Sequence, residues 1–268
     1  MSQTTPILLL GAGRLGGALI DGWMAVGAFA PREIIVVDPH PGPQAQGLEA
    51  QGARLNPSDA VIAEARTVLL AVKPQLWREA AAALEPKLAK DAVIVSVAAG
   101  VTAGDIARAF KGRATARVMP ITAVAVGKGA AGVFAPDATA RARAHALFDP
   151  VAGVVDIEDE GLMDAVTAVC GSAPAYLYAF VEALQAAGVA EGLSEDAART
   201  LARATIVGAA ALLGASPEEP AELRRQVTSP GGTTEAALKV LMGEGGLGPL
   251  LQEAVAAAAR RSRELAKS

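Results

Sequence analysis

Aromatic residues, cysteine and histidine are all scarce in this chain of 268 residues. Aromatics make up 3% of the chain although 52% of its residues are hydrophobic, so alanine and leucine fill the interior and favour closely packed helices over an aromatic-lined groove. The single cysteine, Cys170, excludes an internal disulfide and a cysteine-based metal cage. The two histidines, His40 and His145, are too few and too scattered for most zinc sites. We therefore expect no metal centre.

Clusters of basic residues and long hydrophobic runs are also missing. The net charge is −4, and no group of lysines and arginines forms a stripe that would neutralise a phosphate backbone, which argues against nucleic acid as a partner. The apolar run Ile7–Leu10 is broken by Gly11, and the residues before it carry no basic patch, so we expect no signal peptide. No uncharged apolar stretch is long enough to cross a membrane. We expect a cytoplasmic protein with a small-molecule substrate and no membrane partner.

Short β-branched runs alternate with helix-forming segments over the first half of the chain. Such alternation predicts βαβ units and a parallel sheet with helices on both faces. The last two runs have less helix between them, which predicts a less regular edge of the sheet, and a final short strand is expected near residues 151–157. The other predicted strands lie at residues 7–10, 34–37, 68–72, 93–97, 116–119 and 132–134.

The second half of the chain has a different character. After Asp159 no strand pattern recurs, and alanine, leucine and glutamate repeat at helical spacing. Ser194 and Ser216 each begin a pattern typical of a capped helix start, the second with Pro217 at the first helical position. The sequence therefore predicts an α/β fold in two domains: a Rossmann-type doubly wound sheet over residues 1–158 and an all-α domain over residues 159–268.

A glycine-rich loop, Gly11-Ala12-Gly13-Arg14-Leu15-Gly16, lies between the first predicted strand and the helix that follows. Gly11 permits a tight turn, Gly13 lets a pyrophosphate approach the backbone, and Gly16 allows the helix to pack closely on the strand. The start of the helix places free amides and the positive end of its dipole near the diphosphate. We predict a dinucleotide site here that includes Arg14 and Leu15.

Asp38 ends the second predicted strand, about twenty residues beyond the glycine-rich loop. A carboxylate at this position accepts hydrogen bonds from an adenosine ribose and repels a 2′-phosphate, which favours NADH. His40 and Arg14 lie nearby in the sequence and would partly offset that repulsion. Asp38, followed by Pro39, equally fits a residue that caps a turn. The choice between NADPH and NADH therefore stays open on these residues.

Three further loops leave predicted strands at the carboxyl edge of the sheet, where ligands bind in such folds. Each fits an ordinary strand-ending loop on its own, but together they line one crevice. The cofactor-binding residues predicted in these loops are Ala71, Val72, Lys73, Pro74, Ala98, Met119 and Pro120.

The segment Val227–Thr234 sets hydroxyls, two glycines and free backbone donors at the start of an apolar helix. Its serine and proline are expected to end the preceding helix, and one of its last two threonines is expected to cap the next. Free amides at a helix start favour a bound anion, so the turn suits a carboxylate. The predicted substrate-binding residues are Ser229, Gly231, Gly232, Thr233 and Thr234.

No strong acid–base residue accompanies these two loops. His145 and Glu182 lie in predicted helices and fit solvated or packed side chains. Hydride addition to a ketone requires a proton donor for the forming alkoxide, whereas a cyclic imine is basic and enters already protonated. Positioning would then supply most of the catalysis of an imine reduction.

The chain resembles the pyrroline-5-carboxylate reductase family along nearly its whole length. The first matching segment would fit many dehydrogenases, whereas the last two are specific to the family. The segments are GAGRLGGALI from Gly11 to Ile20, AVKPQ from Ala71 to Gln75, SVAAGV from Ser96 to Val101, RVMP from Arg117 to Pro120, AVTAVCGSAPAYLYAFVEAL from Ala165 to Leu184, and LRRQVTSPGGTTEAAL from Leu223 to Leu238.

This resemblance implies reduction of 1-pyrroline-5-carboxylate to L-proline, the last step of proline synthesis, with NADPH preferred by most members and NADH accepted by some. It implies that the substrate carboxylate binds backbone donors at Gly232, Thr233 and Thr234. The Thr234 hydroxyl would contact the ring nitrogen, as a proton donor or as an orienting group, which makes Thr234 the predicted catalytic residue.

The resemblance also places the nicotinamide in a crevice lined by Lys73, Ala98 and Met119. It implies a helical domain that interleaves with its copy in a homodimer, with dimers often forming a decamer. The composition also favours an oligomer, because a helical domain with so few aromatics would bury too little apolar surface as a monomer.

One position departs from the family pattern. Ile121 stands where members have an asparagine after Met-Pro, so a polar contact near the cofactor and substrate is missing. Two alternatives therefore remain open on the sequence. One is a catalytically weak relative that binds nucleotide and has a regulatory or interaction role; the other is a β-hydroxyacid dehydrogenase. A β-hydroxyacid dehydrogenase would require a lysine as general acid on the long interdomain helix, and Val166–Ala187 contains no lysine.

Overall fold

The structure, a computed structural model, describes residues 3–266, which form two compact units. The first unit is built from the chain up to Gly171 together with the chain from Ala258 onward, and it contains a β-sheet. The second unit, Ser172–Ala257, is helical in its described elements.

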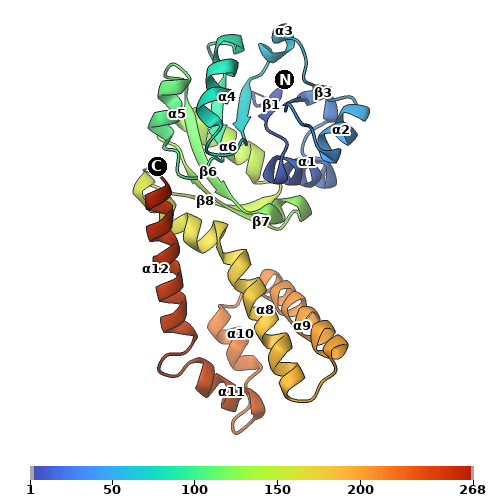
Figure 1. Cartoon of the computed structure of the whole chain (residues 1–268), viewed down its shortest axis with the longest axis vertical. Coiled ribbons are helices and arrows are strands. Elements are labelled where there is room, and N and C mark those ends of the chain that lie inside the picture. The colour runs from blue at the N-terminus through green and yellow to red at the C-terminus, as the bar shows by residue number, and fades with distance from the viewer. Residues whose placement is uncertain (1–2, 267–268) are drawn as a thin grey trace. The chain divides into compact units, whose positions relative to one another are not determined.

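The sheet of the first unit has eight strands in the order β3-β2-β1-β4-β5-β6-β7-β8 (Figure 1). The chain runs outward from β1 to β3, returns to β4 on the other side of β1, and continues outward from there. All neighbouring strands are parallel except β6 and β7. The doubly wound, Rossmann-type sheet predicted from the sequence is thus confirmed. The strands are β1 (Ile7–Leu10), β2 (Ile34–Val37), β3 (Arg54–Leu55), β4 (Thr67–Leu70), β5 (Val93–Ser96), β6 (Thr115–Pro120), β7 (Gly129–Phe134) and β8 (Ala152–Asp156).

Helices cover both faces of this sheet and bury two separate hydrophobic clusters (Figure 1). Because side chains alternate across a strand, Ile7 and Leu9 of β1 join one cluster while Leu8 and Leu10 join the other. The first cluster includes residues of α1, α2 and α6, and the second includes residues of α3, α4 and α5. These helices are α1 (Arg14–Val26), α2 (Pro43–Ala50), α3 (Asp59–Ile62), α4 (Trp77–Leu84), α5 (Ala103–Ala109) and α6 (Ala138–Phe148).

The antiparallel pair β6–β7 makes the edge of the sheet irregular, as the weak helical signal between the two runs predicted. Their link contains the 3₁₀ segment η3 (Thr122–Val126), which is too short for the crossover that a parallel pair needs. In this segment the Val124 carbonyl oxygen lies 2.1 Å from the position of a Cβ on Gly22 of α1. Only glycine permits so close an approach between α1 and the link.

The C-terminal end of α12 (Leu247–Leu265) completes the first unit. The Ser262 hydroxyl donates a hydrogen bond to Asp164 of α7 (Met163–Val166). The backbone of Ala266 lies 3.4 Å from the position of a Cβ on Gly100, in the loop after β5. Two separate stretches of the chain therefore build the sheet-containing unit.

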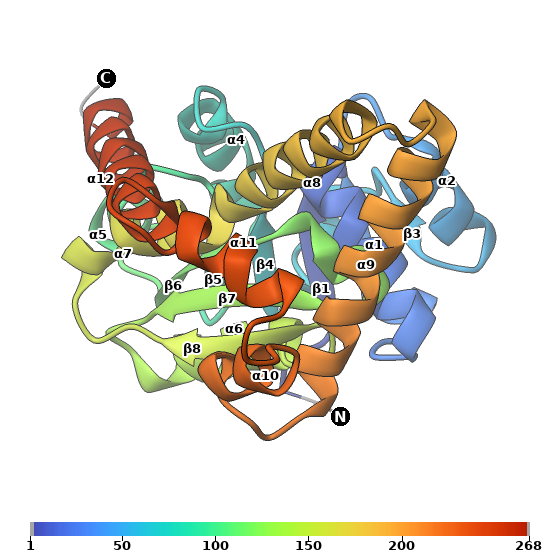
Figure 2. The same ribbon diagram turned by 90° about the horizontal axis from the view of Figure 1, so that it is seen from below.

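The second unit contains helices only, among its described elements. Its helices are α8 (Ala173–Ala190), α9 (Glu195–Ala215), α10 (Pro220–Gln226), α11 (Thr233–Leu241) and the first part of α12. α8 and α9 pack side by side (Figures 1 and 2). In residues 3–266, no helix combines the length and the apolar character needed to span a membrane.

The two helix starts predicted in this unit have different outcomes. Ser194 caps α9, because its hydroxyl accepts a hydrogen bond from the Ala197 amide at 3.3 Å. The start predicted at Ser216 is wrong, since α10 begins at Pro220. A residue before a proline is held in extended geometry, so Glu219 cannot continue a helix from Pro217 into Pro220.

His145, near the end of α6, lies between two carboxylates. Its Nδ1 is 2.9 Å from Asp149 Oδ1, and its Nε2 is 3.3 Å from Asp156 Oδ1. Burial lowers the pKa of the imidazole, but hydrogen bonds and charge attraction from the two carboxylates outweigh it, so the pKa of His145 lies above its ordinary value of 6.5.

We expect this histidine to stabilise the fold more at low pH than at high pH. Because its folded pKa is raised, its contribution is fully present below the unfolded pKa and is lost as pH rises through the folded pKa. The melting temperatures of the wild type and His145→Gln should therefore differ more at about pH 5.5 than at about pH 8.5. Asp149→Asn should shrink that pH-dependent difference, and a gap that is equal at both pH values would contradict the assignment.

Candidate functional site

The loop after β1 is tightly packed on one side and open on the other. Gly11 has a φ of +94°, and a Cβ on it would lie 2.9 Å from the Ala71 carbonyl oxygen. A Cβ on Gly16 would lie 2.2 Å from the Gly11 carbonyl oxygen. Around Gly13, by contrast, nothing lies within 4 Å of the Cβ position. Internal packing therefore requires glycine at positions 11 and 16, whereas Gly13 leaves open space over the loop.

α1 begins directly after this loop, and no side chain caps its first amides. None of the described residues accepts a hydrogen bond from the amides of Gly13, Arg14, Leu15 or Gly16. The first turn of α1 contains no acidic residue, and the exposed Arg14 adds a positive charge. A helix start of this kind suits a bound pyrophosphate.

Asp38, which follows β2, uses its carboxylate to hold the glycine-rich loop. Its Oδ2 accepts a hydrogen bond from the Ala12 amide at 2.6 Å, and its Oδ1 accepts one from the His40 amide at 2.7 Å. Asn56 braces the Asp38 backbone, with Oδ1 accepting from the Asp38 amide at 2.9 Å and Nδ2 donating to the Asp38 carbonyl at 2.8 Å. These contacts agree with the turn-capping interpretation of Asp38. Asn56 was not among the residues predicted from the sequence, although the pair Asn56-Pro57 is a typical turn signal.

We expect Asp38→Ala to weaken the binding of NADPH and NADH alike, by about tenfold, because a hydrogen bond to a charged acceptor contributes about 1.5–3 kcal/mol. The substitution frees the Ala12 amide and loosens the loop under both cofactors. Dissociation constants for the two reduced cofactors measure this effect, and Asp38→Asn, which keeps an acceptor, serves as the control. Tighter NADPH binding together with weaker NADH binding would instead mean that Asp38 discriminates between the two riboses.

The loops after β4 and β5 follow two strands on the same side of β1, because β4 lies next to β1 and β5 lies next to β4. The Ala71 amide donates to the Leu10 carbonyl at 2.8 Å, which joins the end of β4 to the end of β1. In the next loop Ala98 is buried, and its amide donates to Ser96 Oγ at 3.2 Å. The predicted residues at this place with exposed side chains are Lys73 and Pro74, while Ala71 and Val72 are half-buried.

The end of β6 is covered by a π-helix, Thr167–Gly171. Met119 and Pro120 are buried there, and the Cys170 thiol donates to the Met119 carbonyl at 3.6 Å. Burial raises the pKa of the Cys170 thiol, so the thiol stays protonated at neutral pH and serves as a packed donor. Ile121, the next residue after β6, is half-buried, and its amide donates to a carbonyl of β7 at 3.1 Å.

In the second unit, Ser229–Gly232 form a tight turn between α10 and α11. The Gly232 amide donates to the Ser229 carbonyl at 3.0 Å, and Gly231 has a φ of +71°, as in a type II turn with Pro230 at its first central position. The serine and proline do not end α10 as predicted, because that helix already ends at Gln226.

The predicted threonine cap of α11 is also wrong. Gly232 is the N-cap residue, and its helix has no side-chain cap. Instead, Glu235 Oε2 accepts a hydrogen bond from the Gly231 amide at 2.5 Å. Thr233 and Thr234 already have helical geometry, whereas a capping residue must lie just before the helix. Glu235 was not among the predicted site residues, although a glutamate three residues after a cap is a known sign of a helix start.

This arrangement leaves several donors of the turn free. None of the described residues accepts a hydrogen bond from the Thr233 or Thr234 amide. The hydroxyls of Ser229, Thr233 and Thr234 also have no hydrogen-bond partner within residues 3–266. Thr234 is half-buried, whereas Ser229 and Thr233 are exposed. Free donors at the positive end of a helix dipole suit a carboxylate.

The predicted site residues thus fall into two groups. Those predicted to bind the cofactor gather where the strands of one sheet end, and those predicted to bind the substrate gather on one turn of the helical unit. Within the described part of the chain, no three His, Cys, Asp or Glu side chains are grouped as a metal site requires.

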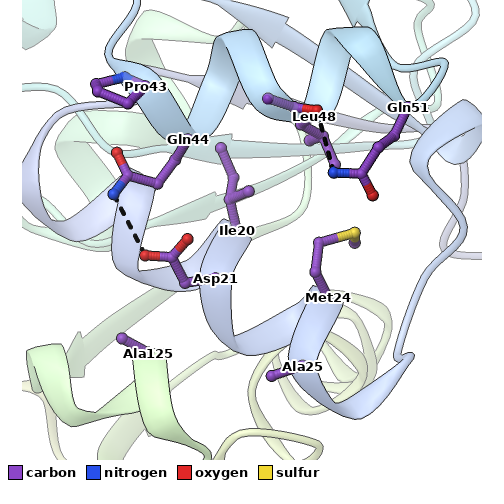
Figure 3. A pocket seen from close by; sticks show the side chains of 10 residues that line it. Ile20, Asp21, Met24, Ala25, Pro43, Gln44, Leu48, Gln51 and Ala125 are labelled. Carbon is purple, nitrogen blue, oxygen red and sulfur yellow. Dashed lines mark hydrogen bonds between the residues drawn. The ribbon is translucent and has the colours of Figure 1, made fainter.

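A hollow of about 700 Å³ lies elsewhere in the first unit, between α1 and α2 (Figure 3). Asp21 and Gln44 point toward each other at one side of it, with Gln44 Nε2 donating to Asp21 Oδ2 at 3.4 Å (Figure 3). Ile20, Met24 and Leu48 supply apolar lining. None of the predicted site residues lines this hollow, so its volume alone does not mark it as the site.

Comparisons with known proteins agree with the geometry of both units. The family described as "Pyrroline-5-carboxylate reductase dimerisation" matches residues 160–265, and the family described as "NADP oxidoreductase coenzyme F420-dependent" matches residues 6–100. The chain is 39% identical to pyrroline-5-carboxylate reductase of Synechocystis over 265 residues, which cover 97% of each chain. It is 38% identical to the same enzyme of Pseudomonas aeruginosa over 271 residues, which cover 99% of this chain and 98% of the relative.

Solved structures show the same likeness. A pyrroline-5-carboxylate reductase from Coxiella burnetii superposes with a TM-score of 0.89 at 32% identity, covering 99% of this chain and 100% of that one. The Plasmodium falciparum pyrroline carboxylate reductase with NADP bound superposes with a TM-score of 0.81 at 24% identity, covering 98% and 99%, and so shows a shared fold.

Proposed function

Because the chain belongs to the pyrroline-5-carboxylate reductase family, we propose that it reduces 1-pyrroline-5-carboxylate to L-proline with a hydride from NADPH or NADH, the last step of proline biosynthesis. The observation that carries this proposal is the pair of free amides at Thr233 and Thr234, at the start of a helix in the unit that matches the family. Residues 1–158 would form the dinucleotide-binding domain and residues 159–268 the substrate-binding and dimerisation domain.

The residues of the first unit fit a dinucleotide. The open space over Gly13 and the free amides of Arg14, Leu15 and Gly16 would receive the pyrophosphate. Lys73, exposed after β4, would contribute a positive charge at the same edge of the sheet. When bound, the reduced nicotinamide supplies the hydride.

The residues of the second unit fit the imine. The amides of Thr233 and Thr234 would bind its carboxylate, which orients the carbon–nitrogen double bond. The hydride adds to the imine carbon and a proton ends on the ring nitrogen, so the half-buried Thr234 hydroxyl would either deliver that proton or orient a nitrogen that is already protonated. No other side chain is required as an acid, because the substrate is itself basic.

An assay with purified protein, 1-pyrroline-5-carboxylate and each reduced cofactor tests this function. We expect consumption of a cofactor and formation of proline. Absence of turnover with both cofactors, alongside calorimetric binding of nucleotide, would instead identify a binding protein with a regulatory role.

The helical unit leaves a large apolar surface exposed in the single chain, and its family is a dimerisation domain. A second copy would bury this surface, so we propose a homodimer. As parts of the same proposal, five dimers form a decamer and the protein is located in the cytoplasm. Light scattering tests the assembly, and a monomer at micromolar concentration would refute it. The exposed large side chains include Leu177, Tyr178, Phe180, Leu184, Leu201, Val207, Leu212, Leu213, Val240, Leu241, Leu250 and Leu251.

A further inference from the structure

The turn that presents the free amides is held by a side chain to which the proposed reaction gives no role. Glu235, in the first turn of α11, accepts a hydrogen bond from the Gly231 amide. We propose that Glu235 is a positioning residue, which fixes this turn so that the amides of Thr233 and Thr234 face the substrate carboxylate. This proposal rests on the proposed function.

The contacts of Glu235 form a short chain along the helix. Its Oε2 is 2.5 Å from the Gly231 amide nitrogen, and its Oε1 is 3.4 Å from Lys239 Nζ, one helical turn later. The Glu235 side chain is 38% exposed and that of Lys239 is 74% exposed. Lys239 therefore orients the carboxylate only loosely, and the bond to Gly231 is the main constraint that Glu235 places on the turn.

The backbone of this turn is unusually flexible in its sequence, so a hydrogen bond that fixes it has a large effect. Gly231 has a φ of +71°, and the next residue is also a glycine, so two successive positions have unusual backbone freedom. The Gly232 amide is committed to the Ser229 carbonyl, which closes the turn from within. The Glu235 bond ties the outer side of the turn to the helix whose free amides form the site. Without that bond, ordering the turn would be added to the cost of substrate binding.

The charge of Glu235 acts in the opposite direction. A carboxylate beside a site for another carboxylate disfavours the substrate, and Lys239 offsets only part of that repulsion because both side chains are solvated. Positioning and charge can therefore be separated by substitution. Glutamine keeps an oxygen acceptor for the Gly231 amide but removes the charge, whereas alanine removes both.

Steady-state kinetics with Glu235→Ala, Glu235→Gln and the wild type tests the proposal. We expect Glu235→Ala to raise the KM for the imine about tenfold, with kcat within about threefold and the KM for NADPH unchanged. Glu235→Gln should have an imine KM equal to or below that of the wild type. Lys239→Met should change it less than about threefold, since exposed ion pairs contribute little. Glu253→Ala, at an exposed position on α12, is the matched control.

Two outcomes would overturn the positioning role. The first is that Glu235→Ala has the same KM for the imine as the wild type. The second is that Glu235→Gln has a raised imine KM, as Glu235→Ala does, although the melting temperatures of both variants equal that of the wild type. Wild-type turnover is measured first, so its absence would count against the proposed function. In that case, calorimetric titration of proline with oxidised cofactor present replaces the assay. The same tenfold loss of proline affinity would then support the role of Glu235, whereas unchanged affinity, or no binding by the wild type, would refute it.

Discussion

Gly16→Ala is expected to lower the affinity for both cofactors by at least about 100-fold, which corresponds to about 2.8 kcal/mol. The new Cβ would lie 2.2 Å from the Gly11 carbonyl oxygen, a separation that real atoms do not adopt. The helix start must then move away from β1 and carry its free amides with it. The same clash should destabilise the fold by about 1–3 kcal/mol, the usual cost of overpacking. Calorimetric titration with NADPH and a thermal melt measure the two effects.

Gly13→Ala tests whether a side chain in this loop can block the cofactor without disturbing the packing of the protein. Nothing lies within 4 Å of its Cβ, so we expect an unchanged melting temperature together with weaker cofactor binding. Gly47→Ala, at an exposed position of α2, is the control and should lower neither the cofactor affinity nor the melting temperature. If Gly16→Ala bound cofactor like the wild type, the glycine-rich loop would not be the pyrophosphate site.

Thr234→Ala is expected to lower kcat about 100-fold if its hydroxyl donates the proton, because general acid catalysis typically contributes at least that much. If the hydroxyl only orients the ring nitrogen, a loss of about tenfold or less is expected, as for one neutral hydrogen bond. Single-turnover rates with saturating imine distinguish the two roles. In either case the dissociation constant of NADPH should stay unchanged.

Thr234→Ser is the matched variant, since it keeps the hydroxyl and should retain most of the activity. Thr228→Ala provides a second control on the same segment, because the Thr228 hydroxyl is already bound to the Arg224 carbonyl at 2.7 Å. An equal loss of NADPH affinity in Thr234→Ala would contradict the assignment of this residue to the substrate.

The sheet was predictable because its central strands are buried on both faces and therefore read as unbroken apolar runs. Ile7–Leu10 and the glycines that follow identify the first strand, the turn and the helix start without any reference to distant residues. β3 has only two residues, Arg54 and Leu55, and no apolar run marks it. The weak helical signal after β6 correctly indicated the irregular edge, because a short link allows only an antiparallel partner.

The sequence suggests which residues belong to the candidate site, but it does not predict the hydrogen-bond partners that these residues have in the structure. The sequence identified Asp38 and the turn before α11, yet it left open what the Asp38 carboxylate does, and it assigned the cap of α11 to a threonine. The actual partners, Ala12 for Asp38 and Gly231 for Glu235, depend on backbone directions that local propensity does not encode. Which residue becomes the N-cap depends on where the helical backbone begins, and with Gly232 in that position both threonines already lie inside the helix.

The return of α12 to the sheet-containing unit has a consequence for how the chain is made. The Ser262–Asp164 bond and the packing of Ala266 on the loop after β5 involve residues that follow the whole helical unit, Ser172–Ala257, in the chain. The sheet-containing unit therefore cannot make these contacts until the intervening helical unit has been synthesised, even though its first strand is made early. A recombinant fragment that stops at Gly171 would lack these contacts, and a stable minimal version would need the C-terminal stretch grafted back by a linker.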